Sequence, residues 1–436
     1  MILQAGPADS PLRGELIPPG DKSISHRAII LGSLASGQSR IEGLLESEDV
    51  RATVSACRQL GMQIHEDGEA LLLDGVGARR LTAPAGPLDM GNSGTAMRLL
   101  TGVLAAQPYN SQLIGDASLS RRPMRRIVQP LSLMGASIQT SDASTPPLLI
   151  TGNPHLQGIE YVSPVASAQV KSCVLLAGLY ARGETRVSEP EKSRDHTEKM
   201  LPSFGVPVGA GCAVSGGSRL AAAQIRVPGD LSSAAFLMVA AAMLPGSLLT
   251  LQNVGLNETR DGIIHVLEAM GAGLRVFNRR QYGQEAVGDI EIRHQGLLKG
   301  IDIPVQWIPS LIDELPAIMA LAAVAGGVTR IRGARELRVK ESDRIAVMAR
   351  GLESLGVRLK EYADGIDIEG GKIRGGKVDG AGDHRCAMSF CIIAQRADSS
   401  VEVNGCGNID TSYPGFVRDL DAAGGLIASR DGDQKE

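Results

Sequence analysis

Aromatic side chains are scarce in this chain, and their scarcity narrows the functions that it could perform. Phe, Trp and Tyr together make up 3% of the 436 residues, so there is little material for stacking on nucleic-acid bases. Positive charge is not in excess either, because the net charge is −4 at pH 7. We therefore expect no nucleic-acid partner. Any anionic ligand would have to bind at a local cluster of basic side chains.

Metal, cofactor and membrane signals are also missing from the sequence. The six cysteines form no CxxC pair and the seven histidines show no metal-ligand spacing, so we expect reduced thiols and no metal. Neither GxGxxG after a strand nor a P-loop motif occurs, which leaves nucleotide cofactors without support. The longest apolar run, residues 234–244, is shorter than the roughly 20 residues that span a bilayer. The N-terminus lacks the regions of a signal peptide, so we expect a cytoplasmic protein without a membrane segment.

The sequence does contain a sixfold internal repeat. In each copy a predicted amphipathic helix ends at a glycine, and a strand-like tail follows, as in CRQLGMQI and LESLGVRL. A glycine just after a helix readily takes the left-handed conformation that ends it. Six such glycines recur at spacings of 66 to 85 residues, which predicts a repeating unit of about 70 residues: Gly61, Gly135, Gly205, Gly271, Gly356 and Gly424.

A second pattern, out of phase with the first, consists of six Ala- and Leu-rich helices that are apolar nearly all round. Such helices are expected to be buried, and here they begin near Gly20, Gly91, Val165, Val227, Pro309 and Gly382. The chain length suggests two domains, and six units divide most simply as three and three. The sequence predicts an α/β (or α+β) fold with one domain at 21–228 and the other at 1–20 plus 229–436.

Polar and basic residues gather at the starts of these helices: Lys22, Ser23, Arg27, Asn92, Ser93, Thr95, Arg98, Ser167, Gln169, Lys171, Ser232, Ser233, Asp313, Glu314, His384 and Arg385. A helix N-terminus carries partial positive charge and binds anions readily. Ordinary N-capping explains the Ser, Asn and Asp residues equally well. It does not explain Lys22, Lys171 or Arg385, because a cation at a helix start opposes the dipole. Their placement suggests bound anions.

Eight strings in order resemble the 5-enolpyruvylshikimate-3-phosphate (EPSP) synthase family along nearly the whole chain: PGDKSISHRAIILGSLASG, GNSGTAMRLL, GDASLSRRPM, ASAQVKS, RDHTEKML, LIDELP, RVKESDR and GDHRCAM. ASAQVKS and RDHTEKML are similar to the subgroup called class II. The resemblance implies a two-domain inside-out α/β barrel in which each domain has three βαβαββ repeats, with buried helices and outer sheets. It implies transfer of an enolpyruvyl group from phosphoenolpyruvate to shikimate-3-phosphate by a cytoplasmic monomer without a cofactor.

The resemblance also implies roles for individual residues. Asp313, Glu341 and Lys22 would be catalytic: Asp313 would deprotonate or orient the shikimate hydroxyl, while Glu341 or Lys22 would handle the proton at C3. Shikimate-3-phosphate would be held by Lys22, Ser23, Arg27, Ser167, Ala168, Gln169, Lys171, Arg194, Asp313 and Lys340. Phosphoenolpyruvate would be held by Lys22, Asn92, Gly94, Thr95, Arg122, Gln169, Glu341, Arg344, His384 and Arg385. For Asp313, N-capping of the fifth buried helix is the alternative.

The chain departs from the family pattern at three positions. Ala168 replaces a serine of many members, and Lys171 would then replace that serine as a phosphate contact. Thr411 stands where many members have a lysine, and Leu99 stands where many have a proline. Gly94 leaves room for the phosphonate of the inhibitor glyphosate, whereas the subgroup includes tolerant members, so sensitivity stays open.

Two alternatives compete with this interpretation. The sister enzyme that acts on UDP-N-acetylglucosamine uses a loop cysteine, but residues 115–126 contain none. A non-catalytic anion-binding scaffold would not need Asp313, Glu341 and His384 beside the basic cluster.

Overall fold

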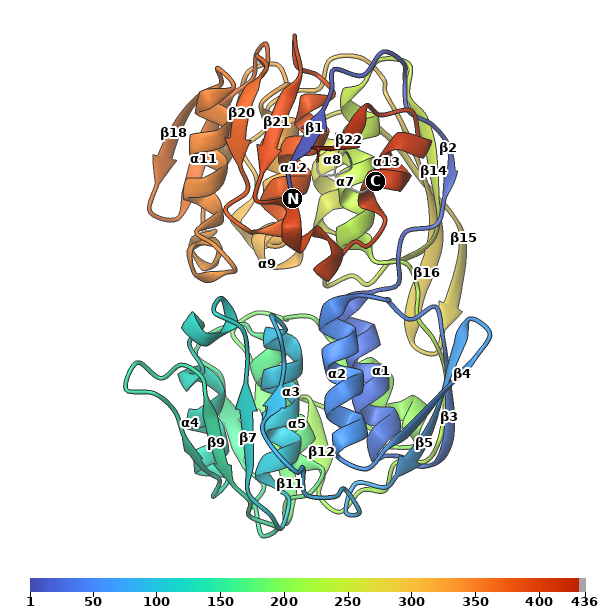
Figure 1. Cartoon of the computed structure of the whole chain (residues 1–436), viewed down its shortest axis with the longest axis vertical. Helices are drawn as coiled ribbons and strands as arrows, with labels where there is room; N and C mark the ends of the chain where they lie inside the picture. Colours follow the sequence, from blue (N-terminus) through green and yellow to red (C-terminus); the bar gives the residue numbers. More distant parts are fainter. Residues whose placement is uncertain (431–436) are drawn as a thin grey trace, which may run out of the picture. The chain divides into compact units, whose positions relative to one another are not determined.

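A computed structural model describes residues 1–430 of the chain, and these residues form two units (Figure 1). Unit 1 contains Met1–Pro19, Pro228–Arg280 and the chain from Ala286 on, and unit 2 contains Gly20–Val227 with Gln281–Glu285. The chain passes from one unit to the other after Pro19 and after Val227, each one residue before the boundary expected from the sequence. The segment Gln281–Glu285, which the sequence analysis left in the C-terminal domain, belongs to unit 2.

Unit 2 contains three sheets and three helices that are buried along most of their length. The sheets have the strand orders β13(Gln224–Arg226)-β3(Ser36–Glu42)-β5(Ala70–Val76)-β4(Gln63–Asp67), β6(Leu88–Asp89)-β7(Ser111–Ile114)-β9(Leu148–Thr151)-β8(Ser137–Gln139) and β10(Glu160–Val162)-β11(Glu184–Ser188)-β12(Ala213–Ser215). The buried helices are α1 (Lys22–Leu34), α3 (Gly94–Ala105) and α5 (Ala168–Gly178). The other α-helices of the unit are α2 (Glu48–Gln59), α4 (Arg125–Leu133) and α6 (His196–Met200).

Unit 1 follows the same plan. Its sheets have the orders β20(Gly376–Asp379)-β21(Val401–Asn404)-β1(Leu3–Ala5)-β22(Ile427–Ser429), β15(Gly273–Tyr282)-β16(Glu285–Arg293)-β14(Leu248–Gly255)-β2(Arg13–Leu16) and β17(Val328–Ile331)-β19(Gly365–Glu369)-β18(Arg358–Tyr362). The buried helices are α7 (Leu231–Met243), α10 (Leu315–Ala322) and α12 (His384–Ala394). Four further helices are α8 (Gly262–Ala269), α9 (Ile308–Leu311), α11 (Arg344–Ser354) and α13 (Phe416–Ala422). The fold class is therefore mixed α/β.

The buried helices connect parallel strands. In chain order, α3 lies between β6 and β7, α5 between β10 and β11, and α12 between β20 and β21, and each of these strand pairs is parallel. At each crossing between the units, the strand after the buried helix pairs with a strand from a distant part of the chain that belongs to the same unit. Helix α1 follows β2 in the chain, but the strand after it, β3, pairs in parallel with β13. Helix α7 follows β13, and the strand after it, β14, pairs in parallel with β2.

Both sequence patterns that predicted the repeat are found in the structure. The six repeat glycines all have φ between 80° and 103°, which confirms the left-handed conformation that was predicted for each of them. Every residue of α7 is buried, as its all-round apolar sequence predicts. The expected helix after Pro309 is instead divided into α9 and α10, with Asp313 between them.

Small residues let the buried helices approach each other closely. A Cβ atom placed on Gly102 of α3 would lie 2.2 Å from the backbone oxygen of Cys173 in α5, so only glycine fits there. This contact fixes the spacing of the two helices whose first turns carry Gly94, Thr95 and Gln169. No helix in residues 1–430 has the length and apolar character needed to cross a bilayer.

Candidate functional site

The start of α1 places a lysine and a buried arginine on one turn. Asp21 caps the helix by accepting a hydrogen bond from the backbone N–H of Ile24, and Lys22 forms an ion pair with Asp49 of α2. Asp49 is buried, and its Oδ1 atom has no hydrogen-bond partner among the described residues. Lys22 is thus held at the helix start by a carboxylate from the neighbouring helix.

Arg27, one turn further along α1, is 3% exposed and donates to neutral oxygens. Its Nε donates to Thr197 Oγ1 (2.7 Å), its Nη1 to the backbone oxygen of Ser23 (2.9 Å) and its Nη2 to Ser172 Oγ (2.8 Å). Burial lowers the pKa of Arg27 to about 10, since the nearby carboxylates compensate only part of the desolvation. A buried guanidinium that is paired with neutral groups is suited to receive an anionic ligand.

The first turn of α3 lies beside two more arginines. Arg98 Nη1 donates to Gln169 Oε1 of α5 (2.6 Å), and Gln169 Nε2 donates to Thr95 Oγ1 (2.9 Å). Arg122 donates to Asn92 Oδ1 and to Ser118 Oγ. A Cβ atom on Gly94 would lie 2.8 Å from Arg98 Nη1 and 3.2 Å from Arg122 Nη1. The absence of a side chain at Gly94 therefore lets both guanidinium groups approach the start of α3 closely.

A loop carboxylate fixes the position of Arg122. Asp116 accepts hydrogen bonds from Asn92 Nδ2 (2.7 Å) and from the backbone N–H of Leu119 (2.7 Å). Asn92 in turn accepts from Arg122, so loop 116–122 is tied to the start of α3 through these side chains. The predicted phosphoenolpyruvate residues Asn92, Gly94, Thr95, Arg122 and Gln169 lie together in unit 2.

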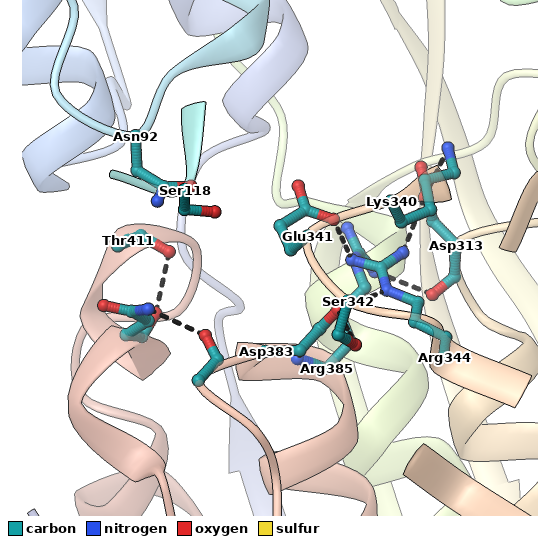
Figure 2. A network of polar contacts seen from close by, with 12 residues as sticks. Asn92, Ser118, Asp313, Lys340, Glu341, Ser342, Arg344, Asp383, Arg385 and Thr411 are labelled. Carbon is teal, nitrogen blue, oxygen red and sulfur yellow. Dashed lines mark hydrogen bonds and ion pairs between the residues drawn. The ribbon is translucent and has the colours of Figure 1, made fainter. Parts of the chain in front are cut away.

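In unit 1 a buried arginine is surrounded by carboxylates (Figure 2). Arg344, at the start of α11, donates from Nε to Asp383 Oδ2 (2.8 Å), from Nη1 to Asp313 Oδ1 (3.2 Å) and from Nη2 to Glu341 Oε2 (2.6 Å). Burial opposes the charge, but Asp383, Glu341 and Asp313 outweigh it and raise the pKa of Arg344 well above its ordinary value. The arrangement holds the two predicted proton-transfer carboxylates, Asp313 and Glu341, on one guanidinium.

The remaining predicted residues of unit 1 lie close to this group. Lys340 Nζ is 3.4 Å from Asp313 Oδ1, and Arg385 Nη1 donates to the backbone oxygen of Asp313 (3.1 Å). Asp383 caps α12, whose first residue is the buried His384. Helix α10 is preceded by Glu314, so the Asp313 carboxylate does not cap it. The side chain of Thr411 donates to the backbone oxygen of Asn408.

The structure corrects the inference of bound anions from cations at helix starts. Lys22 is paired with Asp49, Lys171 with Glu189 and Glu198, and Arg385 lies 4.0 Å from Glu314. Carboxylates of the chain itself therefore offset these cations against the helix dipoles. Their position alone does not require a bound ligand.

Residues 1–430 contain no group of three or more His, Cys, Asp or Glu side chains that could hold a metal ion. The six cysteines are free thiols, and burial raises the pKa of Cys57 and Cys173 to about 12. The site residues therefore offer ammonium, guanidinium and carboxylate groups for chemistry.

Comparison with known proteins assigns the family. The family model described as EPSP synthase (3-phosphoshikimate 1-carboxyvinyltransferase) matches residues 7–420. Two relatives named 3-phosphoshikimate 1-carboxyvinyltransferase are each 52% identical to this chain. The match to the relative from Methylococcus capsulatus covers 96% of both chains, and the match to the relative from Legionella pneumophila covers 93% of this chain and 94% of the relative. The chain belongs to the EPSP synthase family.

A solved EPSP synthase from Acinetobacter baumannii matches this chain with a TM-score of 0.88 and 47% identity. The match covers 98% of this chain and 99% of the solved chain. The family and the enzyme class predicted from the sequence are confirmed by these comparisons. Several residues that contact the predicted site residues were not predicted from the sequence: Asp49, Asp116, Glu189, Thr197, Glu198 and Asp383. Asp49 and Glu189 lie outside the motif strings, whereas the other four lie within them and were given no role. The cations Lys22 and Lys171 at helix starts were the one signal for their carboxylate partners.

Proposed function

We propose that this chain transfers the enolpyruvyl group of phosphoenolpyruvate to the 5-hydroxyl of shikimate-3-phosphate and releases phosphate. The observation that carries the proposal is the division of charge between two sets of predicted residues. Unit 2 offers a buried arginine with neutral partners, and unit 1 offers two carboxylates held on one arginine. We also propose that each unit is an inside-out barrel of three βαβαββ repeats, and that the protein acts as a cytoplasmic monomer without a cofactor.

Unit 2 would supply most of the substrate contacts. Ser23, Arg27, Ser167, Gln169 and Arg194 would bind shikimate-3-phosphate. The buried Arg27 supports this assignment because an anion would complete its charge compensation. Asn92, Gly94, Thr95 and Arg122 would bind phosphoenolpyruvate, with Lys22 reaching both substrates. The close approach of the Arg98 and Arg122 guanidinium groups to Gly94 supports that assignment, because it gathers positive charge at the start of α3.

Unit 1 would move the protons. In the addition step, the 5-hydroxyl oxygen attacks C2 of phosphoenolpyruvate, Asp313 accepts or orients the hydroxyl proton, and Glu341 delivers a proton to C3. A tetrahedral intermediate with a new C–O bond results. In the elimination step, C3 loses a proton, the bond from C2 to the phosphate oxygen breaks, and phosphate leaves. Arg344, Arg385 and Lys340 would stabilise negative charge near the reacting atoms.

The test is release of phosphate by the purified protein. We expect release when shikimate-3-phosphate and phosphoenolpyruvate are both present, and none with either substrate alone. Release that requires UDP-N-acetylglucosamine in place of shikimate-3-phosphate would assign the protein to the sister reaction. No release with any acceptor, together with binding of both anions, would identify a non-catalytic scaffold.

A further inference from the structure

All three N–H donors of the Lys171 ammonium group already have acceptors within the protein. Its side chain is 4% exposed, and its ammonium group lies 2.8 Å from Glu189 Oε2, 2.8 Å from Glu198 Oε1 and 3.3 Å from the backbone oxygen of Ser193. An ammonium group has three N–H donors, and three acceptors surround this one. Burial lowers the pKa of Lys171, but Glu198 and Glu189 outweigh it and the pKa is raised overall. A phosphate could reach this ammonium only by displacing one of its acceptors.

Both carboxylate oxygens of Glu189 also accept hydrogen bonds from within the protein. Its Oε1 accepts from the backbone N–H of Ser167 (2.8 Å) and from Ser193 Oγ (2.7 Å), and its Oε2 accepts from the backbone N–H of Ser193 (3.3 Å). Ser167 immediately precedes α5, and its own side chain does not cap that helix. Glu189 therefore ties segment 189–193 to the residue that precedes α5, while the first turn of the helix has no side-chain cap.

The same network extends to the other predicted shikimate-3-phosphate residues. Arg194 follows Ser193 directly in the chain, and α6 begins two residues later. Glu198 of α6 bonds to Lys171, while Thr197 of α6 accepts from Arg27 Nε (2.7 Å) and shares a 2.7 Å hydrogen bond with Ser172 of α5. The segment that carries Arg194 is thus held to α5 and α1 by buried polar contacts.

We propose that Glu189 and Lys171 are positioning residues, which lock the segment carrying Arg194 against α5 before shikimate-3-phosphate binds. The proposal rests on the proposed function and revises the predicted role of Lys171 as a phosphate contact. Two carboxylates around one ammonium leave a net charge of −1, which repels a phosphate from Lys171 itself. The phosphate is bound instead by Arg194 and by the uncapped start of α5.

Glu189→Gln is the decisive variant because it keeps the shape of the side chain. A glutamine would turn an amide N–H₂ toward Lys171 or Ser167, which are both donors, and would break the network. We expect about tenfold weaker binding of shikimate-3-phosphate by calorimetry, and faster hydrogen exchange in residues 189–195 of the ligand-free protein. The turnover number at saturating substrate should stay near that of the wild type. Lys171→Met should show the same pattern.

Glu191→Gln is the matched control, since it removes the same charge from an exposed position on the same segment. Equal or tighter binding by Glu189→Gln would overturn the proposal, because freeing the lysine would then help the phosphate. Weaker binding by Lys171→Met with unchanged exchange in residues 189–195 would also overturn it and identify a direct contact. If Lys171→Met does not fold, Glu189→Gln alone decides. A wild-type protein that does not bind shikimate-3-phosphate would refute the proposed function, whereas the exchange results would still test the network.

Discussion

Two arginines, one in each unit, are equally buried but have opposite surroundings. Arg27 in unit 2 is 3% exposed and donates to two hydroxyls and a backbone carbonyl. Arg344 in unit 1 is 1% exposed and donates to three carboxylates. The pKa of Arg27 is lowered to about 10 by burial, while the Asp383, Glu341 and Asp313 carboxylates overcome burial and raise that of Arg344.

The difference shows how one repeated architecture provides two kinds of chemistry. A buried cation without a full counter-charge is costly in the free protein, and an anionic ligand relieves that cost on binding. A buried cation with three carboxylates is already compensated, and it fixes the position of those carboxylates, which suits the proposed proton transfer. We therefore assign anion binding chiefly to unit 2 and proton transfer chiefly to unit 1.

The largest expected effect tests the proton-transfer half of this comparison. Asp313→Asn keeps the size of the side chain but removes its basicity, so kcat should fall by about 100-fold or more. Steady-state phosphate release measures this fall. Asp302→Asn is the control, because Asp302 pairs with Arg330 at the surface and its side chain is 72% exposed. Near-normal turnover of Asp313→Asn would remove Asp313 from proton transfer.

A smaller effect is expected at the anion-binding half. Gly94→Ala would place a methyl group 2.8 Å from Arg98 Nη1, so the arginine must shift and the space beside it narrows. The KM for phosphoenolpyruvate should rise about tenfold, which corresponds to about 1.4 kcal/mol, and inhibition by glyphosate should weaken. Gly86→Ala is the control, since a Cβ atom there meets no atom within 4 Å. An unchanged KM would place phosphoenolpyruvate away from Gly94.

The smallest expected effect concerns protonation of His26, the residue before Arg27 in α1. Burial lowers the pKa of His26 well below 6.5, and the nearby Lys22 and Arg27 lower it further. The unfolded chain therefore takes up this proton first, and the stabilising contribution that is present above pH 6.5 is lost as the pH falls below it. Between pH 7 and pH 5.5 His26 should account for about 1 kcal/mol of lost stability. Chemical denaturation of the wild type and His26→Gln at both pH values measures it, and identical pH dependences would show that His26 has the same pKa in the folded and the unfolded chain.

The repeat could be predicted because it depends on local rules. Gly205 and Gly424 end outer helices in the left-handed conformation, and α7 is buried along its whole length, as glycine spacing and apolar patterning indicate. The division into α9 and α10 has a local cause that the expectation of one helix overlooked: Pro316 lies in the first turn of α10, where proline is tolerated, and it disfavours a helix interior. The sequence does not show that Gln281–Glu285 belongs to unit 2.

Motifs predicted the candidate site as a set of residues but not as a set of pairs. Motifs identified Lys22, Arg344 and Asp313, and the structure adds their partners from elsewhere in the chain. Asp49 lies outside every motif string and Asp383 lies within one, and contact between distant segments makes them the counter-charges of Lys22 and Arg344. Pairing of this kind depends on tertiary packing, so residue spacing cannot show it.

The most direct test of the contrast between the two units is the free energy of unfolding of Arg27→Met and Arg344→Met without ligand. Arg344→Met leaves the buried Asp383 and the partly buried Asp313 and Glu341 without their shared cation and should cost about 3–5 kcal/mol. Arg27→Met removes a charge that lacks full compensation and should change the stability by about 1 kcal/mol or less. Chemical denaturation of both variants and the wild type gives the comparison. Equal losses, or a larger loss for Arg27→Met, would contradict the account.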